Sequence, residues 1–153
     1  MTFQIALQIA YILSIGIMAG IYVIFSNTIM PSLKELENGA FVMAKINDVI
    51  LNPVFKLFFF FSAMCSAYLG LLASHIDLVF RLACAMFLLG TFVVTLLKNV
   101  PLNNALKRAI STHSQIDEVW AEYLVSWVKW NHVRSVSAVL AIILVCVSSF
   151  LTQ

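Results

Sequence analysis

Four apolar runs alternate with segments that carry most of the polar side chains. The runs cover about residues 3–25, 54–74, 78–97 and 136–151. The first contains no charged residue, and as a helix its roughly 23 residues would span about 35 Å, enough to cross a ~30 Å hydrocarbon core. Residues 74–77 alone separate the second and third runs, which predicts a helical hairpin. Because unpaired backbone groups cannot face lipid, the pattern predicts an all-α, four-helix membrane bundle that forms a single domain over residues 1–153.

The residues that flank the runs indicate where the helices begin and end. Asn52 is placed to cap a helix whose first residue is Pro53. Pro31 and Pro101 are expected just beyond the first and third helices, because proline disrupts a helix interior. After Pro101 the chain has neither glycine nor proline, so the fourth helix is expected to begin near Gln115. It would then extend well beyond the bilayer as an amphipathic, aromatic-rich segment.

Composition and charge point to lipid as the solvent. Of the 153 residues, 62% are hydrophobic and 10% are charged, whereas soluble domains have roughly 45–50% and about 25%. This excludes an ordinary soluble enzyme, a disordered tail and a secreted disulfide module, and a net charge of +2 gives no nucleic-acid footprint. All basic residues except Arg81 lie in or beside the two long segments between runs. The positive-inside rule therefore predicts cytoplasmic long loops and outside termini in a multi-pass membrane protein.

Polar side chains gather at the ends of the runs that are expected to be cytoplasmic. Thr91, Thr95 and Asn99 recur every four residues and lead to Asn103, and Asn47 precedes the second run. Such side chains either cap and connect helices or line a polar pocket. The three cysteines show no paired spacing that would hold zinc or an iron–sulfur cluster, and no nucleotide, hydrolase or HExxH motif occurs. We therefore predict no metal site.

An aromatic stripe precedes the fourth run. At 100° per residue, five side chains fall within an arc of about 80° on one helix face; they are Trp120, Tyr123, Trp127, Asn131 and Arg134. An aromatic belt at the membrane interface is the commoner source of Trp and Tyr at such a position. The alternative is a pocket wall, in which flat rings stack on a ligand and the donors beyond them bind a carbonyl or an anion.

His132 is the candidate base. It lies about 100° around the helix from Asn131 and so flanks the stripe. A histidine without companions is more often structural than catalytic. Here the neighbouring Arg134 opposes protonation of the imidazole, which would leave it neutral and able to accept a proton near neutral pH.

Two blocks of sequence resemble the anthrone oxygenase-like family of membrane proteins. They are Asn-Val-Pro-Leu-Asn at 99–103 and Trp-Val-Lys-Trp-Asn-His-Val-Arg at 127–134, and weaker blocks at 30–33 and 46–55 extend the likeness over almost the whole chain. The resemblance to this family, which includes bacterial members, implies a four-helix integral membrane protein of a bacterial inner membrane. In fungal members it also implies an oxygenase that converts an anthrone to an anthraquinone with O2, without metal or flavin, so we expect no cofactor. The implied site residues are Asn47, Asn99, Asn103, Trp127, Asn131, His132 and Arg134.

Taken together, these features predict a cofactor-independent oxidation of an anthrone-like or other polycyclic phenolic substrate by O2. His132 would remove a proton, while Asn131 and Arg134 would stabilise the resulting enolate. The remaining candidate residues would bind the substrate; they are Trp127, Tyr123, Trp120, Asn99, Asn103 and Asn47. The expected partners are an apolar aromatic molecule that enters from membrane lipid, and O2, with homo-oligomerisation left open.

Two other functions are compatible with the same residues. The first is a non-catalytic membrane protein that binds a quinone, a lipid or another aromatic molecule. The second is a haem protein with His132 as axial ligand. A transporter is disfavoured, because the four short spans show neither an inverted repeat nor a broken helix at mid-membrane.

Overall fold

The computed structural model describes residues 3–74 and 76–151, and these form helices and connections without strands. The elements are α1 (Phe3–Ile24), the π-helical η1 (Phe25–Ile29), α2 (Met30–Lys34), α3 (Gly39–Ile50), α4 (Pro53–Leu71), α5 (Leu78–Phe87), the π-helical η2 (Leu88–Val93) and η3 (Thr95–Asn99), α6 (Val100–Thr112) and α7 (Ile116–Leu151). Several join end to end, which gives four helices long and apolar enough to cross a membrane: Phe3–Lys34, Pro53–Leu71, Leu78–Thr112 and Ile116–Phe150. The chain is therefore an all-α, multi-pass membrane protein, as predicted.

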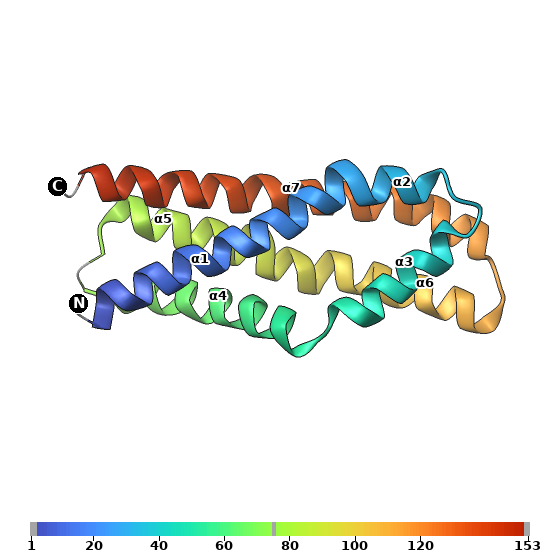
Figure 1. Ribbon diagram of the computed structural model, residues 1–153, viewed down its shortest axis with the longest axis horizontal. Helices are drawn as coiled ribbons and strands as arrows, with labels where there is room; N and C mark the ends of the chain where they lie inside the picture. Colours follow the sequence, from blue (N-terminus) through green and yellow to red (C-terminus); the bar gives the residue numbers. More distant parts are fainter. Residues whose placement is uncertain (1–2, 75, 152–153) are drawn as a thin grey trace.

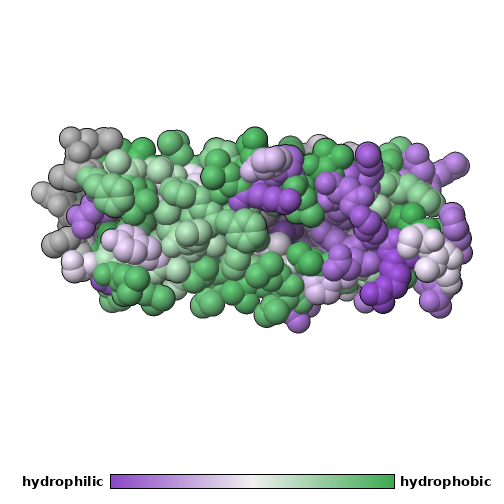
Figure 2. All heavy atoms as spheres, turned by 90° about the horizontal axis from the view of Figure 1, so that it is seen from below, coloured by the Kyte–Doolittle hydropathy of each residue, from purple (hydrophilic) through white to green (hydrophobic). Residues whose placement is uncertain are grey.

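The bundle is polarised along its length. Both chain ends and the α4–α5 connection lie at one end of the bundle, and the α2–α3 and α6–α7 connections lie at the other (Figure 1). Figure 2 shows apolar side chains over most of the length and polar ones gathered toward the end formed by α2, α3 and α6. Both long polar segments are thus on one side, although which side faces the cytoplasm stays a prediction.

The prediction that Pro31 and Pro101 end their helices is wrong. Each lies inside a continuous helix, just after a π-helical segment: η1 precedes Pro31 and η3 precedes Pro101. Proline lacks an N–H, and its ring collides with the carbonyl four residues earlier. A π turn widens the helix at that carbonyl and absorbs both effects. The helices therefore continue past the prolines into the polar end of the molecule.

The connection between α4 and α5 is tied by side chains to backbone. Asp77 caps α5 by accepting hydrogen bonds from the amides of Val79 and Phe80. Arg81 donates to the carbonyls of Gly70 and Ala73 at the end of α4, and to that of Ile76. The predicted hairpin is present, although His75 within it lies outside the described residues. The predicted cap of α4 is also confirmed, since Asn52 accepts from the Phe55 amide at 3.0 Å.

Two hydrophobic cores follow each other along the bundle. The first fills the apolar length and includes Tyr11, Met18, Tyr22 and Phe87. The second lies at the polar end, where Phe25, Met43, Leu106, Tyr123 and Trp127 pack together from α3, α6, α7 and η1. The continuous helices Phe3–Lys34 and Leu78–Thr112 contribute to both cores, and so does α7, whose 36 residues extend for about 54 Å. It begins one residue from the predicted start.

Candidate functional site

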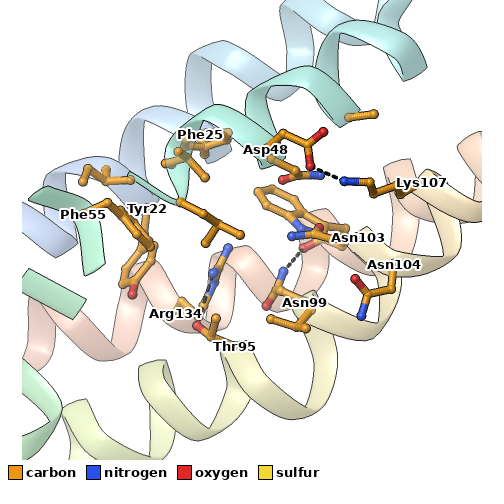
Figure 3. Close-up of a pocket in the computed structure, with 17 residues that line it drawn as sticks. Tyr22, Phe25, Asp48, Phe55, Thr95, Asn99, Asn103, Asn104, Lys107 and Arg134 are labelled. Carbon is orange, nitrogen blue, oxygen red and sulfur yellow. Dashed lines mark hydrogen bonds and ion pairs between the residues drawn. The ribbon is translucent and has the colours of Figure 1, made fainter. Parts of the chain in front are cut away.

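A cavity of about 210 Å³ lies where the two cores meet, and α1, η1, α3, α4, η3, α6 and α7 all contribute to its wall (Figure 3). Its lining residues are Ile21, Tyr22, Phe25, Ala44, Asn47, Asp48, Ile50, Leu51, Phe55, Thr95, Asn99, Val100, Asn103, Asn104, Lys107, Trp127 and Arg134. An engineered cavity of about 150 Å³ is large enough for benzene. The space therefore suits an aromatic ligand of modest size.

Two of the π-helical segments line this cavity. Phe25 comes from η1, and Thr95 and Asn99 come from η3. The Asn99 amide donates to the backbone carbonyl of Trp127 at 3.3 Å, which ties η3 to α7 beside the cavity. Isolated π turns are frequent at functional sites, because they redirect side chains that a regular helix would place elsewhere.

The aromatic stripe of α7 forms a buried stack. The ring centroids of Trp120 and Tyr123 are 5.6 Å apart with an interplanar angle of 23°, and those of Tyr123 and Trp127 are 5.5 Å apart at 15°. Tyr123 is 1% exposed and Trp127 is 4% exposed. For these two rings the membrane-belt interpretation is wrong, because both face the protein interior. Glu118, Glu122 and Lys129 lie exposed on the other side of α7, as predicted.

Arg134 places a buried guanidinium at the cavity wall. The residue is 6% exposed, and it donates to Thr95 Oγ1 at 3.2 Å and to Asn131 Oδ1. Its guanidinium carbon lies 4.6 Å from the ring centroid of Tyr22 and 5.2 Å from that of Trp127. Within residues 3–74 and 76–151, no carboxylate pairs with it. A buried charge without a counter-charge is costly and marks a functional site by default in a membrane protein.

Unpartnered polar atoms cluster around the same cavity. Across the described residues, four buried side-chain atoms have no hydrogen-bond partner: the Tyr22 hydroxyl, Asn99 Oδ1, Trp127 Nε1 and Arg134 Nε. All four residues line the cavity. A buried polar group left without a partner costs about 1–3 kcal/mol, so folded proteins contain few of them. Several such groups around one cavity therefore indicate a functional site. The four residues thus hold two N–H donors, one carbonyl acceptor and one hydroxyl close to the cavity wall, although these atoms themselves are shielded from a water-sized probe.

Residues 41–144, more than half of the chain, match the family model described as anthrone oxygenase. The chain belongs to the anthrone oxygenase family. The matched region runs from α3 to the last third of α7, and so contains most of the cavity wall. Searches of curated proteins and of solved structures found no match for this anthrone oxygenase family member.

Five of the residues predicted for the site line the cavity of this family member. They are Asn47, Asn99, Asn103, Trp127 and Arg134. Tyr123 lies just behind this wall, where its hydroxyl donates to Asn103 Oδ1 at 2.7 Å and accepts from Asn47 Nδ2 at 3.3 Å. Trp120 extends the stack away from the cavity and is half-buried. The structure thus brings together, at one cavity, predicted residues from three parts of the chain: Asn47, the segment from Asn99 to Asn103, and the aromatic stripe of α7.

Two predicted catalytic residues stand apart from the cavity. Asn131 is fully buried, and its amide nitrogen donates to the Tyr22 carbonyl at 2.8 Å and to Ser26 Oγ at 2.6 Å. Both of its amide hydrogens are therefore used within the protein, while its oxygen holds Arg134. His132 is exposed and is not among the lining residues. Within the described ranges, no group of three or more His, Cys, Asp or Glu gathers as metal ligands.

Several lining residues of this anthrone oxygenase family member were not selected from the sequence. Tyr22 and Phe55 lie within apolar runs, where nothing distinguishes them from packing residues. Asp48 and Lys107 form an ion pair, with 2.6 Å between Asp48 Oδ1 and Lys107 Nζ. Their opposite charges at the same polar end were visible in the sequence, but a separation of 59 positions gave no sign that they meet.

Proposed function

We propose that this protein is a membrane oxygenase that binds an anthrone-like or related phenolic substrate, stabilises its anion and lets the anion react with O2. The observation that carries the proposal is Arg134, a buried cation that no carboxylate of the described residues pairs with, at the wall of an aromatic cavity. An anionic oxygen of the substrate would supply the missing counter-charge. Membership in the anthrone oxygenase family adds independent support for this reaction class.

The chemistry needs little beyond proton removal and charge stabilisation. A methylene group between two aryl rings and opposite a carbonyl is acidic, because its anion is delocalised onto the carbonyl oxygen. This electron-rich carbanion reduces O2, and formation of a C–O bond with uptake of a proton gives a hydroperoxide. Loss of water then leaves a ketone. In total, one CH2 group and one O2 give one C=O group and one H2O, so no further reductant is required.

The cavity residues can be assigned roles in this scheme. The Nε–H of Arg134 and the Nε1–H of Trp127 would bind the enolate oxygen, which gains charge as the proton leaves. Asn99 Oδ1 would accept a hydrogen bond from a substrate hydroxyl. Asn131 is a positioning residue, because it holds the guanidinium and contributes no lining atom. The role of His132 as base stays a sequence-based prediction that its exposed position does not support.

Oxygen uptake tests the proposal directly. Purified protein in detergent should accelerate O2 consumption by emodin anthrone, with one O2 consumed for each anthrone converted. Arg134→Met should abolish the acceleration. Saturable binding of the anthrone without accelerated O2 uptake would instead identify a non-catalytic binding protein for aromatic molecules. The same unpartnered polar atoms would then hold a ligand that does not react.

A further inference from the structure

We infer that Asp48 removes the substrate proton at the mouth of the cavity. This inference rests on the proposed function, because it names the base that the proposed reaction requires. Four titratable side chains line the cavity among the described residues: Tyr22, Asp48, Lys107 and Arg134. The inference follows from what each of them can do near neutral pH.

Three of these four side chains are unsuited to act as a base. Tyrosine and lysine side chains ordinarily stay protonated near neutral pH, and arginine does so in nearly every setting. Lys107 is in addition held by its ion pair with Asp48. A carboxylate, by contrast, is ordinarily ionised and ready to accept a proton. Asp48 is the carboxylate that the described cavity wall provides.

The ion pair leaves one oxygen of Asp48 available. Lys107 Nζ donates to Oδ1 at 2.6 Å, and no described residue hydrogen-bonds Oδ2. Lys107, on α6, thereby fixes the carboxylate of α3 at the cavity without occupying the atom that would take the proton. The side chain of Asp48 is 52% exposed, so a proton received there can pass to water.

Asp48 and Arg134 occupy different parts of the wall. Figure 3 shows Arg134 with Thr95 at one side of the cavity and the Asp48–Lys107 pair at another. A substrate between them would place its oxygen at the cation and its acidic C–H toward the carboxylate. A carboxylate is a weak base for a C–H bond, so the transfer depends on the stabilisation of the anion by Arg134.

The step is a proton transfer without oxidation. The C–H bond of the substrate breaks, its electron pair stays on the substrate as the enolate, and a new O–H bond forms at Asp48. The protonated carboxyl then releases its proton to water at the cavity mouth. O2 reacts only afterwards, with the anion, so the proton transfer can be measured in the absence of O2.

Hydrogen exchange under nitrogen tests the inference. Emodin anthrone is mixed with the protein in D2O, and mass spectrometry follows the exchange of its methylene hydrogens. Wild-type protein should accelerate this exchange, and Asp48→Asn should reduce the acceleration about 100-fold or more, as expected for loss of a general base. The anthrone dissociation constant of Asp48→Asn, from tryptophan fluorescence, should stay within a factor of about three, because an exposed ion pair contributes little to stability and the variant should fold.

Two comparison variants sharpen the test. Asp117→Asn makes the same change at an exposed residue of α7 outside the cavity, and should exchange at the wild-type rate. His132→Ala tests the competing base directly. Wild-type exchange in Asp48→Asn, or a loss that follows His132→Ala instead, would overturn the inference, as would the absence of any acceleration by wild-type protein. Accelerated exchange without O2 uptake would refute the oxygenase while leaving the role of Asp48 intact.

Discussion

Arg134→Met should separate anion binding from stability. Methionine has a similar length and no charge, so it can occupy the same space while removing the cation from the cavity wall. We expect the variant to lose little thermal stability and most of its affinity for anionic phenols. A residue that serves only packing would show the opposite behaviour.

The expected stability change is small because two contributions oppose each other. Arg134 donates two hydrogen bonds and lies over two aromatic rings. Hydrogen bonds to charged groups contribute about 1.5–3 kcal/mol each, and desolvated cation–π contacts about 2 kcal/mol. Burying the charge without a carboxylate costs several kcal/mol in return. These contributions roughly cancel, and what remains is the buried Asn131 Oδ1, which loses its donor at a cost of about 1–3 kcal/mol. We therefore expect the free energy of unfolding to fall by about 1–3 kcal/mol, and Tm to fall by about 2–12 °C.

The expected change in binding is much larger. Removing one partner of a buried, hydrogen-bonded charge pair typically costs about 2–5 kcal/mol. This cost corresponds to an increase in Kd of roughly 30- to 4,000-fold. Thermal unfolding in detergent, followed by circular dichroism, measures the stability. Quenching of tryptophan emission by the phenol under nitrogen measures the binding, because Trp127 lines the cavity.

Arg81→Met is the matched control. Arg81 donates to three backbone carbonyls near the α4–α5 connection, at the far end of the bundle. Its removal should lower Tm, since each carbonyl that loses its partner costs about 1–3 kcal/mol, and should leave Kd unchanged. If Arg134→Met lowers Tm as much as Arg81→Met and leaves Kd at the wild-type value, Arg134 is a structural arginine and the anion-binding argument fails.

Three further outcomes are expected. Tyr123→Phe removes the donor to Asn103 and should lower stability by about 1 kcal/mol, measured by thermal unfolding, with the aromatic stack retained. Trp127→Phe removes an N–H that has no partner within the described chain. The variant should therefore lose more free energy of ligand binding than free energy of unfolding. A titration that gives the wild-type Kd would contradict that role. The hydrogen bond from Ser148 lowers the pKa of Asp77. The ionised Asp77 carboxylate therefore stabilises the fold fully above the pKa of about 3.9 that it has in the unfolded chain, and this stabilisation is lost as the pH falls below that value. Asp77→Asn should flatten the resulting decline of Tm at acidic pH.

The membrane bundle could be predicted because its causes are local. Uninterrupted apolar runs require helices in lipid, and the cap at Asn52 needs only neighbouring residues. The continuation of two helices through Pro31 and Pro101 could not be predicted in the same way. It depends on the π turns that precede the two prolines, and no residue type marks where such a turn forms.

The candidate site was predicted in part for a similar reason. Helical spacing correctly placed Trp127 and Arg134 on one face of α7, and that face proved to be buried. The same spacing left His132 beside the stripe, but only the packing of the other helices shows that it points away from the cavity. Tyr22 was hidden because one tyrosine in an apolar run has no distinguishing neighbour.

The position of the cavity between the two cores has a consequence for kinetics. Its wall combines Phe55 and Tyr22 from the apolar length with Asp48 and Lys107 from the polar end. A phenolic substrate would therefore reach it from the zone between acyl chains and headgroups, where such amphiphiles accumulate. The relevant concentration is then the mole fraction of substrate in the lipid or detergent phase. Adding detergent at a fixed bulk concentration of substrate would dilute that phase and slow turnover, as it does for interfacial enzymes.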